Sequence, residues 1–167
     1  MDQDQTYLNN CFNHRYPMPI EPNPFDDERL AQVRAEQGDP LIQYYIVRTD
    51  IPMSAGKIGA QIAHGAQMFV LRYETLTERH KTEMTPLKPE YEALLGVVKE
   101  WLDGSFRKVV LGGKKKDFEK IIAELSVFLV RDAGLTEVEP NSETVLVTWP
   151  IRKSAQPKCL SRLQTLK

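Results

Sequence analysis

Polar residues suited to chemistry stand in two segments, each placed directly after an apolar run. The first segment holds Lys57, Gln61 and His64, which fall within about 60° of one another on a helical wheel of 3.6 residues per turn. The second holds Asp132 and Thr136. A carboxylate can orient or deprotonate a water, and a lysine can stabilise negative charge that develops beside it. The two segments are therefore candidates for one site that activates water beside a cation.

Each of these residues also has an ordinary structural explanation. Lys57 and Gln61 can simply be solvated and His64 partly buried, because most polar stripes on helices are only surface. Asp132 can be a turn aspartate that accepts local N–H bonds, and Thr136 a hydroxyl that satisfies its own loop. From the residues alone, both interpretations stay open.

The elements around these segments alternate between strands and helices. The pattern predicts strands over residues 42–47, 107–111, 127–130 and 144–148, helices over 54–76, 90–102 and 117–125, a short helix near 155–163, a turn at Gly112-Gly113 and a loop over 132–143. Such alternation predicts an α/β domain with a partly parallel sheet, whose ligands bind beyond the carboxyl ends of the strands. If the strands 42–47 and 127–130 run in the same direction, Lys57 and Asp132 meet at one edge of the sheet.

The first predicted helix has a clear beginning and two distinct faces. Ser54 is the expected N-cap, with Met53 and Ile58 placed as a hydrophobic staple. An apolar face lies roughly 130° from the polar stripe on the wheel and is made of Ile58, Ile62, Phe69 and Tyr73. The remaining positions are small, which suggests close approach to a neighbouring backbone: Gly59, Ala60, Ala63, Gly65 and Ala66.

Composition sets the limits of this interpretation. The chain has 167 residues, 41% hydrophobic and 27% charged, with a formal net charge of −1, as expected of an ordinary soluble domain. Its two cysteines, Cys11 and Cys159, make neither a disulfide framework nor a metal-binding spacing. No apolar run approaches the ~20 residues of a membrane helix, and no apolar signal core follows Met1. We therefore expect no membrane association and a cytoplasmic location.

Residues 1–40 differ from the rest of the chain. They contain eight acidic residues, three arginines and five of the eleven prolines, so they read as an acidic, proline-rich extension with at most one short helix over 26–37. The remaining 41–167 carry 19 basic and 15 acidic residues. A mildly basic body permits a polyanionic partner without requiring one. We expect residues 41–167 to form the α/β domain.

Several other motifs do not fit. The segment around Lys57 is not a phosphate-binding P-loop, because Ile58 follows the lysine where a serine or threonine is needed. His14, His64 and His80 lack metal-ligand spacing, so no metal site is expected. The run Lys114–Lys116 is usually a solvated face, although it follows a strand and can contact phosphates.

Several separated motifs together resemble the type II (archaeal and eukaryotic) peptidyl-tRNA hydrolases. The matching residues, in the family's order, are Arg48, Asp50, Gly56-Lys57-Ile58, Gln61, Ala63, His64, Lys108-Val109-Val110, Arg131 to Thr136, Ser142, Thr144-Val145-Leu146, Pro150 and the closing Leu163 to Lys167. The resemblance covers about residues 41–167. It implies a three-layer α/β/α fold with a four-stranded mixed sheet, often in a homodimer.

The resemblance also implies an activity, which is hydrolysis of the ester in peptidyl-tRNA without a cofactor. It implies catalytic roles for Asp132, Lys57, Thr136 and Gln61. Contacts to the tRNA are expected from Lys108, His64, Arg48, Lys114 and Lys115. Asp132 would position or activate the water, and Lys57 would stabilise the charge that develops on the carbonyl oxygen.

The chain departs from the family pattern at Ala55, where the family has the first lysine of a Lys-Gly-Lys motif, and at Trp149, where it has glycine. Two alternatives therefore remain beside the hydrolase. One is a catalytically weakened homologue that binds tRNA or a protein. The other keeps the hydrolase fold but cleaves a different acyl ester.

Overall fold

The computed structural model describes residues 31, 38–82 and 88–167. The chain divides into a unit over Met1–Gln32 and a unit over Val33–Lys167, and the second unit carries the candidate site. Its elements are β1 (Leu41–Arg48), α3 (Ala55–Thr82), α4 (Pro89–Asp103), β2 (Arg107–Gly113), α5 (Lys115–Glu124), β3 (Val127–Arg131), β4 (Glu143–Thr148), β5 (Ile151–Arg152), a 3-10 turn (Lys153–Ala155) and α6 (Lys158–Ser161). The helix expected over 26–37 lies outside the described residues.

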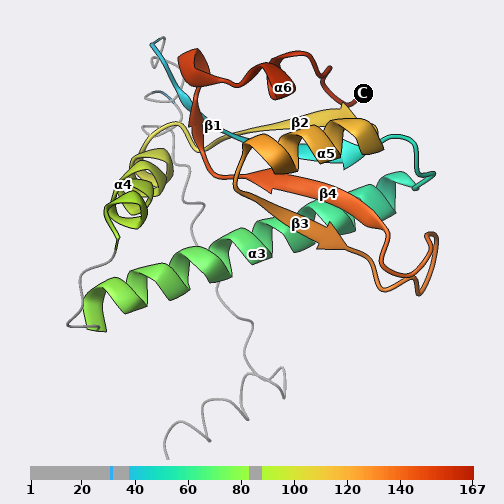
Figure 1. Cartoon of the computed structure of the whole chain (residues 1–167), viewed down its shortest axis with the longest axis horizontal. Helices are drawn as coiled ribbons and strands as arrows, with labels where there is room; N and C mark the ends of the chain where they lie inside the picture. The colour runs from blue at the N-terminus through green and yellow to red at the C-terminus, as the bar shows by residue number, and fades with distance from the viewer. Residues whose placement is uncertain (1–30, 32–37, 83–87) are drawn as a thin grey trace, which may run out of the picture. The chain divides into compact units, whose positions relative to one another are not determined.

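The sheet is mixed, and its strands lie in the order β2-β1-β4-β3 (Figure 1). β1 pairs in parallel with β2, while β4 is antiparallel to both β1 and β3. Three strands, β1, β2 and β3, therefore run in the same direction, and their carboxyl ends lie at the same end of the sheet. The prediction that Lys57 and Asp132 meet depended on this shared strand direction, because each residue follows the carboxyl end of its strand.

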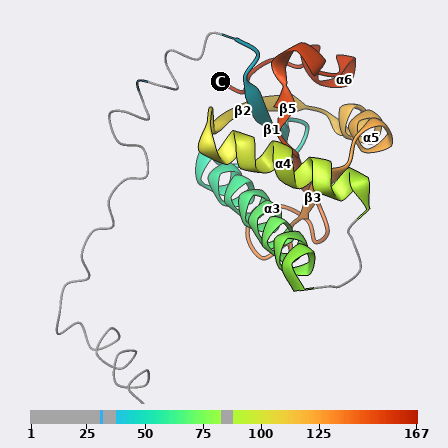
Figure 2. The same cartoon turned by 90° about the vertical axis from the view of Figure 1, so that its left-hand side faces the viewer.

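Helices cover both faces of the sheet, as Figure 2 shows. Successive side chains of β1 point to opposite faces of the sheet, and each set packs against helices. Ile42, Tyr44 and Ile46 pack in a core with Phe118 of α5 and Leu160 of α6. On the other face, Tyr45 and Val47 share a core with residues of α3. The expected three-layer α/β/α architecture is confirmed, with β5 as a short fifth strand beside β1.

The small residues of α3 serve close packing at one position in particular. A Cβ atom on Gly65 would stand 2.5 Å from Cγ2 of Val147 and 3.3 Å from Cγ2 of Val130, so only glycine lets the helix lie this close to β3 and β4. Gly59, by contrast, has open space around it. Further along α3, Phe69 is buried against Trp101 of α4 with the two rings edge to face.

One local prediction from sequence was wrong, and another was correct in part. Gly112 and Gly113 were expected in a turn, but both continue β2, where Gly113 pairs with Arg48. A Cβ atom at either glycine would stand 2.9 Å from a side-chain methyl of β1 or of the residue after it, so the glycines make room for neighbours rather than a reversal. The helix expected over 155–163 is only Lys158–Ser161, because Pro157 precedes its first turn.

Candidate active site

The four predicted catalytic side chains come together at the carboxyl ends of β1 and β3. The ammonium nitrogen of Lys57 lies 2.7 Å from Oδ2 of Asp132 and donates to Oγ1 of Thr136 at 3.0 Å. The side-chain amide of Gln61 donates to the same Asp132 oxygen at 2.6 Å. One helix and one loop thus supply a connected cluster of a cation, a carboxylate, an amide and a hydroxyl.

The start of α3 fixes Lys57. Oγ of Ser54 accepts a hydrogen bond from the backbone N–H of Lys57 at 3.2 Å, so Ser54 is the N-cap that the sequence predicted. Glu137 reaches back from the loop after β3 and accepts from the backbone N–H and the hydroxyl of Ser54, both at 2.7 Å. These bonds lower the pKa of Glu137. The loop that carries Asp132 and Thr136 is therefore attached to the helix that carries Lys57.

Asp132 is held as an anion by donors on both carboxylate oxygens. Oδ2 accepts hydrogen bonds from the Lys57 ammonium group and the Gln61 amide, and Oδ1 accepts one from the backbone N–H of Gly134 at 2.8 Å. The hydrogen bond from Lys57 is the main cause that lowers the pKa of Asp132 below its usual value, followed by the bond from Gly134. A carboxylate with lowered basicity orients Lys57 and water better than it removes a proton.

Gln61 is oriented from behind by a residue that the sequence did not single out for a role. The Gln61 side chain is 1% exposed, and its Oε1 accepts the hydroxyl of Thr144 on β4 at 2.7 Å. With the oxygen engaged by Thr144, the amide nitrogen must face Asp132. The only signal in the sequence was the presence of Thr144 among the residues of the family resemblance.

Gly134 shapes the loop that presents Asp132 and Thr136. Its φ is +75°, and a Cβ atom there would stand 2.4 Å from the backbone nitrogen of Pro140. The loop is closed by two backbone bonds, from Asp132 N–H to Ser142 and from Asn141 N–H to Asp132. Only glycine fits this position, so Gly134 allows its own N–H to reach the Asp132 carboxylate.

The cluster forms one end of a groove of about 680 Å³ between α3 and β3. His64 lines this groove and is exposed, so the predicted stripe of Lys57, Gln61 and His64 does face a common space. An ester bound here would meet the ammonium group of Lys57. Two of the three N–H bonds of that group are directed at Asp132 and Thr136, which leaves the third for a carbonyl oxygen.

Of the five predicted tRNA-binding residues, four do not line this groove: Lys108, Arg48, Lys114 and Lys115. Lys108 pairs with Gln43 near the start of β1, so it lies at the end of the strands opposite Asp132. Its ammonium group packs over the rings of Trp101 and Phe106, and burial there lowers the pKa of Lys108 to about 8.

Arg48 ends β1 but points its guanidinium at Asp50, with Nε to Oδ1 at 2.6 Å. The residue is 8% exposed and also lies over the ring of Phe118. The guanidinium thus already has a carboxylate partner and is mostly covered. Contact of Arg48 with tRNA stays a prediction.

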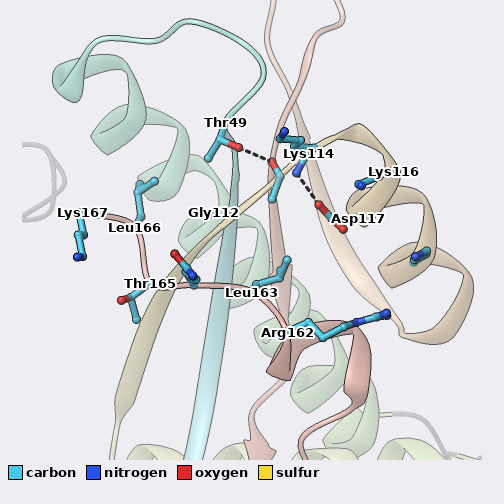
Figure 3. A pocket seen from close by; sticks show the side chains of 13 residues that line it. Thr49, Gly112, Lys114, Lys116, Asp117, Arg162, Leu163, Thr165, Leu166 and Lys167 are labelled. Atoms are coloured by element: carbon cyan, nitrogen blue, oxygen red, sulfur yellow. Dashed lines mark hydrogen bonds between the residues drawn. The ribbon is translucent and has the colours of Figure 1, made fainter.

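Lys114 and Lys115 lie at the carboxyl end of β2, on the sheet edge opposite β3. Lys114 lines a second hollow, of about 700 Å³, between β2, α5 and the C-terminal segment. Figure 3 shows this hollow, with Lys114, Lys116, Arg162 and Lys167 around it. Lys120 is a further cation in its lining. The one acidic residue in its lining, Asp117, accepts the backbone N–H of Lys114. Lys115 faces a separate hollow with Arg131.

Two absences hold within the described residues. No group of three or more histidine, cysteine, aspartate or glutamate side chains gathers closely enough to hold a metal ion. No helix among the same residues is long and apolar enough to cross a bilayer.

Comparison with known proteins identifies the family. The family model described as Peptidyl-tRNA hydrolase PTH2 matches residues 41–166. The chain belongs to the PTH2 family. A peptidyl-tRNA hydrolase of Methanopyrus kandleri is 37% identical over 117 residues, covering 66% of this chain and 85% of that protein. The peptidyl-tRNA hydrolase of Staphylothermus marinus is 35% identical, covering 65% and 80%.

A human relative also matches. The protein named mitochondrial peptidyl-tRNA hydrolase 2 of Homo sapiens is 32% identical over 133 residues, covering 75% of this chain and 63% of that protein. The PTH2 match begins at residue 41, the residue at which β1 begins.

Proposed function

We propose that this protein hydrolyses the ester that joins the peptide to the ribose of tRNA in peptidyl-tRNA. Membership of the PTH2 family and the names of its relatives support this substrate. The observation that carries the proposal is the connected cluster of Lys57, Asp132, Gln61 and Thr136 at the end of an open groove. The alternative of a binding module without turnover has no comparable support, because all four predicted catalytic side chains are present and connected.

In the proposed reaction, water adds to the carbonyl carbon of the ester. The bond from that carbon to the ribose oxygen breaks, the ribose oxygen leaves as a hydroxyl, and the peptide leaves as a carboxylate with release of one proton. Lys57 stabilises the negative charge on the carbonyl oxygen through its third N–H bond. Asp132 holds Lys57 and, with Gln61 and Thr136, orients the water and the ribose.

The remaining predicted contacts concern the RNA. Lys114, with the other cations around its hollow, is placed to bind phosphates of the tRNA, and such contacts weaken as salt rises. Lys115, His64, Arg48 and Lys108 remain proposed tRNA contacts. His64 is the best placed of these four for the terminal nucleotide, since it lines the groove that holds Asp132.

Three broader proposals accompany the activity. Residues 41–167 form the catalytic domain and residues 1–40 an extension, which the match to 41–166 supports. We also propose a cytoplasmic location. A homodimer is expected from the family resemblance.

The test is release of labelled N-acetyl-aminoacyl groups from tRNA by the purified full chain, with and without a chelator. We expect release in both arms, and we expect Lys57→Met to abolish most of it. Lys99→Met is the matched control, because Lys99 is an exposed helical lysine that also pairs with an aspartate. Binding of tRNA without any release would favour the binding module, and release lost on chelation would contradict a reaction run by side chains alone.

A further inference from the structure

One edge of the sheet is open beside the active site. β3 is the last strand in the order β2-β1-β4-β3 and pairs with β4 alone among the described residues. Every second backbone N–H and C=O of an edge strand points away from its partner, so Val127–Arg131 presents unpaired groups along its outer side. The carboxyl end of this edge leads directly to Asp132.

An apolar groove follows the same edge. The groove that contains Asp132 and Lys57 continues past Met68 and Leu71 into an adjoining hollow, because these two residues line both the groove and the hollow. Leu129 lines the first hollow and Phe128 the second, and Figure 1 shows α3 passing along this part of the sheet. Met68 is 39% and Leu71 62% exposed. The groove thus runs from the catalytic cluster toward the beginning of β3.

We infer that this groove receives the peptide part of the substrate as an extended strand added to the outer edge of β3. The inference rests on the proposed function. The ester joins the peptide to the tRNA, so the bound peptide must extend away from the catalytic cluster in one direction. Because the peptide's last carbonyl lies at Asp132, its chain runs parallel to β3, with its preceding residues toward Val127.

Charge separates the peptide side of the ester from the RNA side. The hollow at the β2 edge is surrounded by Lys114, Lys116, Arg162 and other cations, which suits phosphates. The groove at the β3 edge becomes apolar away from the catalytic cluster, where Met68, Leu71 and Phe128 line its continuation. Near the cluster, the charged groups Lys57 and Asp132 are paired with each other. The two edges of one sheet therefore match the two chemically different parts of peptidyl-tRNA.

Edge pairing also suits a substrate whose peptide sequence varies. Main-chain hydrogen bonds supply binding that every peptide can use, whatever its side chains. Met68 is an adaptable surface for different side chains, because its unbranched thioether can take many shapes. Five residues of β3 at roughly 3.3 Å each give space for about four or five peptide residues.

The test compares kcat/KM for tRNA esters that carry one to eight residues. We expect kcat/KM to rise about tenfold in total up to four or five residues and then to stay level. N-methylation of single peptide amides should lower it at every second position, because only alternate N–H groups of a strand face its neighbour. Equal kcat/KM at all lengths, or no alternation on methylation, would overturn the inference. If even the one-residue ester is not hydrolysed, the result would instead count against the proposed function.

A pair of variants on α3 makes the test specific to this groove. Leu71→Asp should reduce the ratio of kcat/KM between the five-residue and one-residue esters to near one. Val70→Asp should keep that ratio, because Val70 is 47% exposed on the same helix and lines neither hollow. Light scattering on the same proteins tests whether a second copy of the chain occupies the β3 edge instead. A dimer that Leu71→Asp dissociates would assign the edge to a second copy of the chain and overturn the inference.

Discussion

The side-chain oxygen of Gln61 accepts the hydroxyl of Thr144 while its nitrogen donates to Asp132. A buried threonine on a central strand thus determines which end of the amide faces the carboxylate. Through this chain of two bonds, β4 orients Asp132 even though it contributes no group to the groove. The site is therefore supported by three elements, α3, β4 and the loop after β3.

Replacing Asp132 with asparagine should lower kcat by about 10²–10³-fold, because the neutral side chain no longer holds Lys57 and the water in place by its charge. Asparagine has one acceptor oxygen in place of two, so its amide nitrogen would face either Lys57 and Gln61 or the N–H of Gly134. Single-turnover release of N-acetyl-aminoacyl-tRNA measures the loss. Asp103→Asn is the control, because Asp103 is an exposed aspartate paired with a lysine. Turnover of Asp132→Asn equal to the parent would remove Asp132 from the mechanism.

Thr144→Val should lower kcat more than it changes KM. Valine keeps the shape of threonine but leaves Oε1 of Gln61 without a donor in a buried place, at a cost of about 1–3 kcal/mol. The amide of Gln61 would then rotate or shift, and Asp132 would lose one of its donors. Thr144→Ser restores the hydroxyl and should recover most of kcat. An equal loss in the serine and valine variants would indicate a packing role only.

Gly134→Ala should disrupt the loop and reduce hydrolysis. An alanine Cβ would lie 2.4 Å from the backbone of Pro140 at a φ of +75°, which is both a clash and a disfavoured conformation. Gly59→Ala is the matched change, because nothing lies within 4 Å of that Cβ. It should raise the free energy of unfolding by about 0.5–1 kcal/mol, since alanine favours helix. Thermal unfolding and turnover of both variants check this contrast.

The contribution of Lys108 to tRNA binding should decrease between pH 7 and pH 9. Its folded-state pKa is lowered to about 8, so the charge is present below pH 8 and is lost above it. The unfolded lysine keeps its proton up to about pH 10.4, so ionisation of this group makes the folded state more stable, not less, as pH rises through this window. Binding titrations at both pH values should show a smaller change in Lys108→Met. An identical change in both proteins would show that Lys108 does not contact the tRNA.

Ala55→Lys should raise kcat/KM and steepen the salt dependence of binding by about one unit of slope. Ala55 is exposed as the first residue of α3, two residues before Lys57, so a lysine there adds a cation beside the site. The cation opposes the helix dipole at a cost of about 0.3–1 kcal/mol. Ala63→Lys, an exposed position further along α3, controls for charge alone. Equal effects of the two lysines would mean that position 55 has no special role.

The sequence alone determined much of the site. The 3.6-residue period placed Lys57, Gln61 and His64 on one stripe, and Ser54 marked the beginning of α3. The alternation of elements predicted that Lys57 and Asp132 would meet, and this was correct because strands separated by helices tend to run in parallel. These features depend on neighbouring residues, whose spacing is visible in the chain.

The tertiary structure decided what depends on pairing between remote segments. Glu137 holds Ser54, and Thr144 holds Gln61, only because β3 and β4 lie next to β1 in this order. Strand register placed Lys108 at the far end of the sheet from Asp132. The open edge of β3 likewise follows from its last place in the strand order. Local residue spacing predicts neither strand order nor strand register, because both result from burying the faces of all the strands and helices at once.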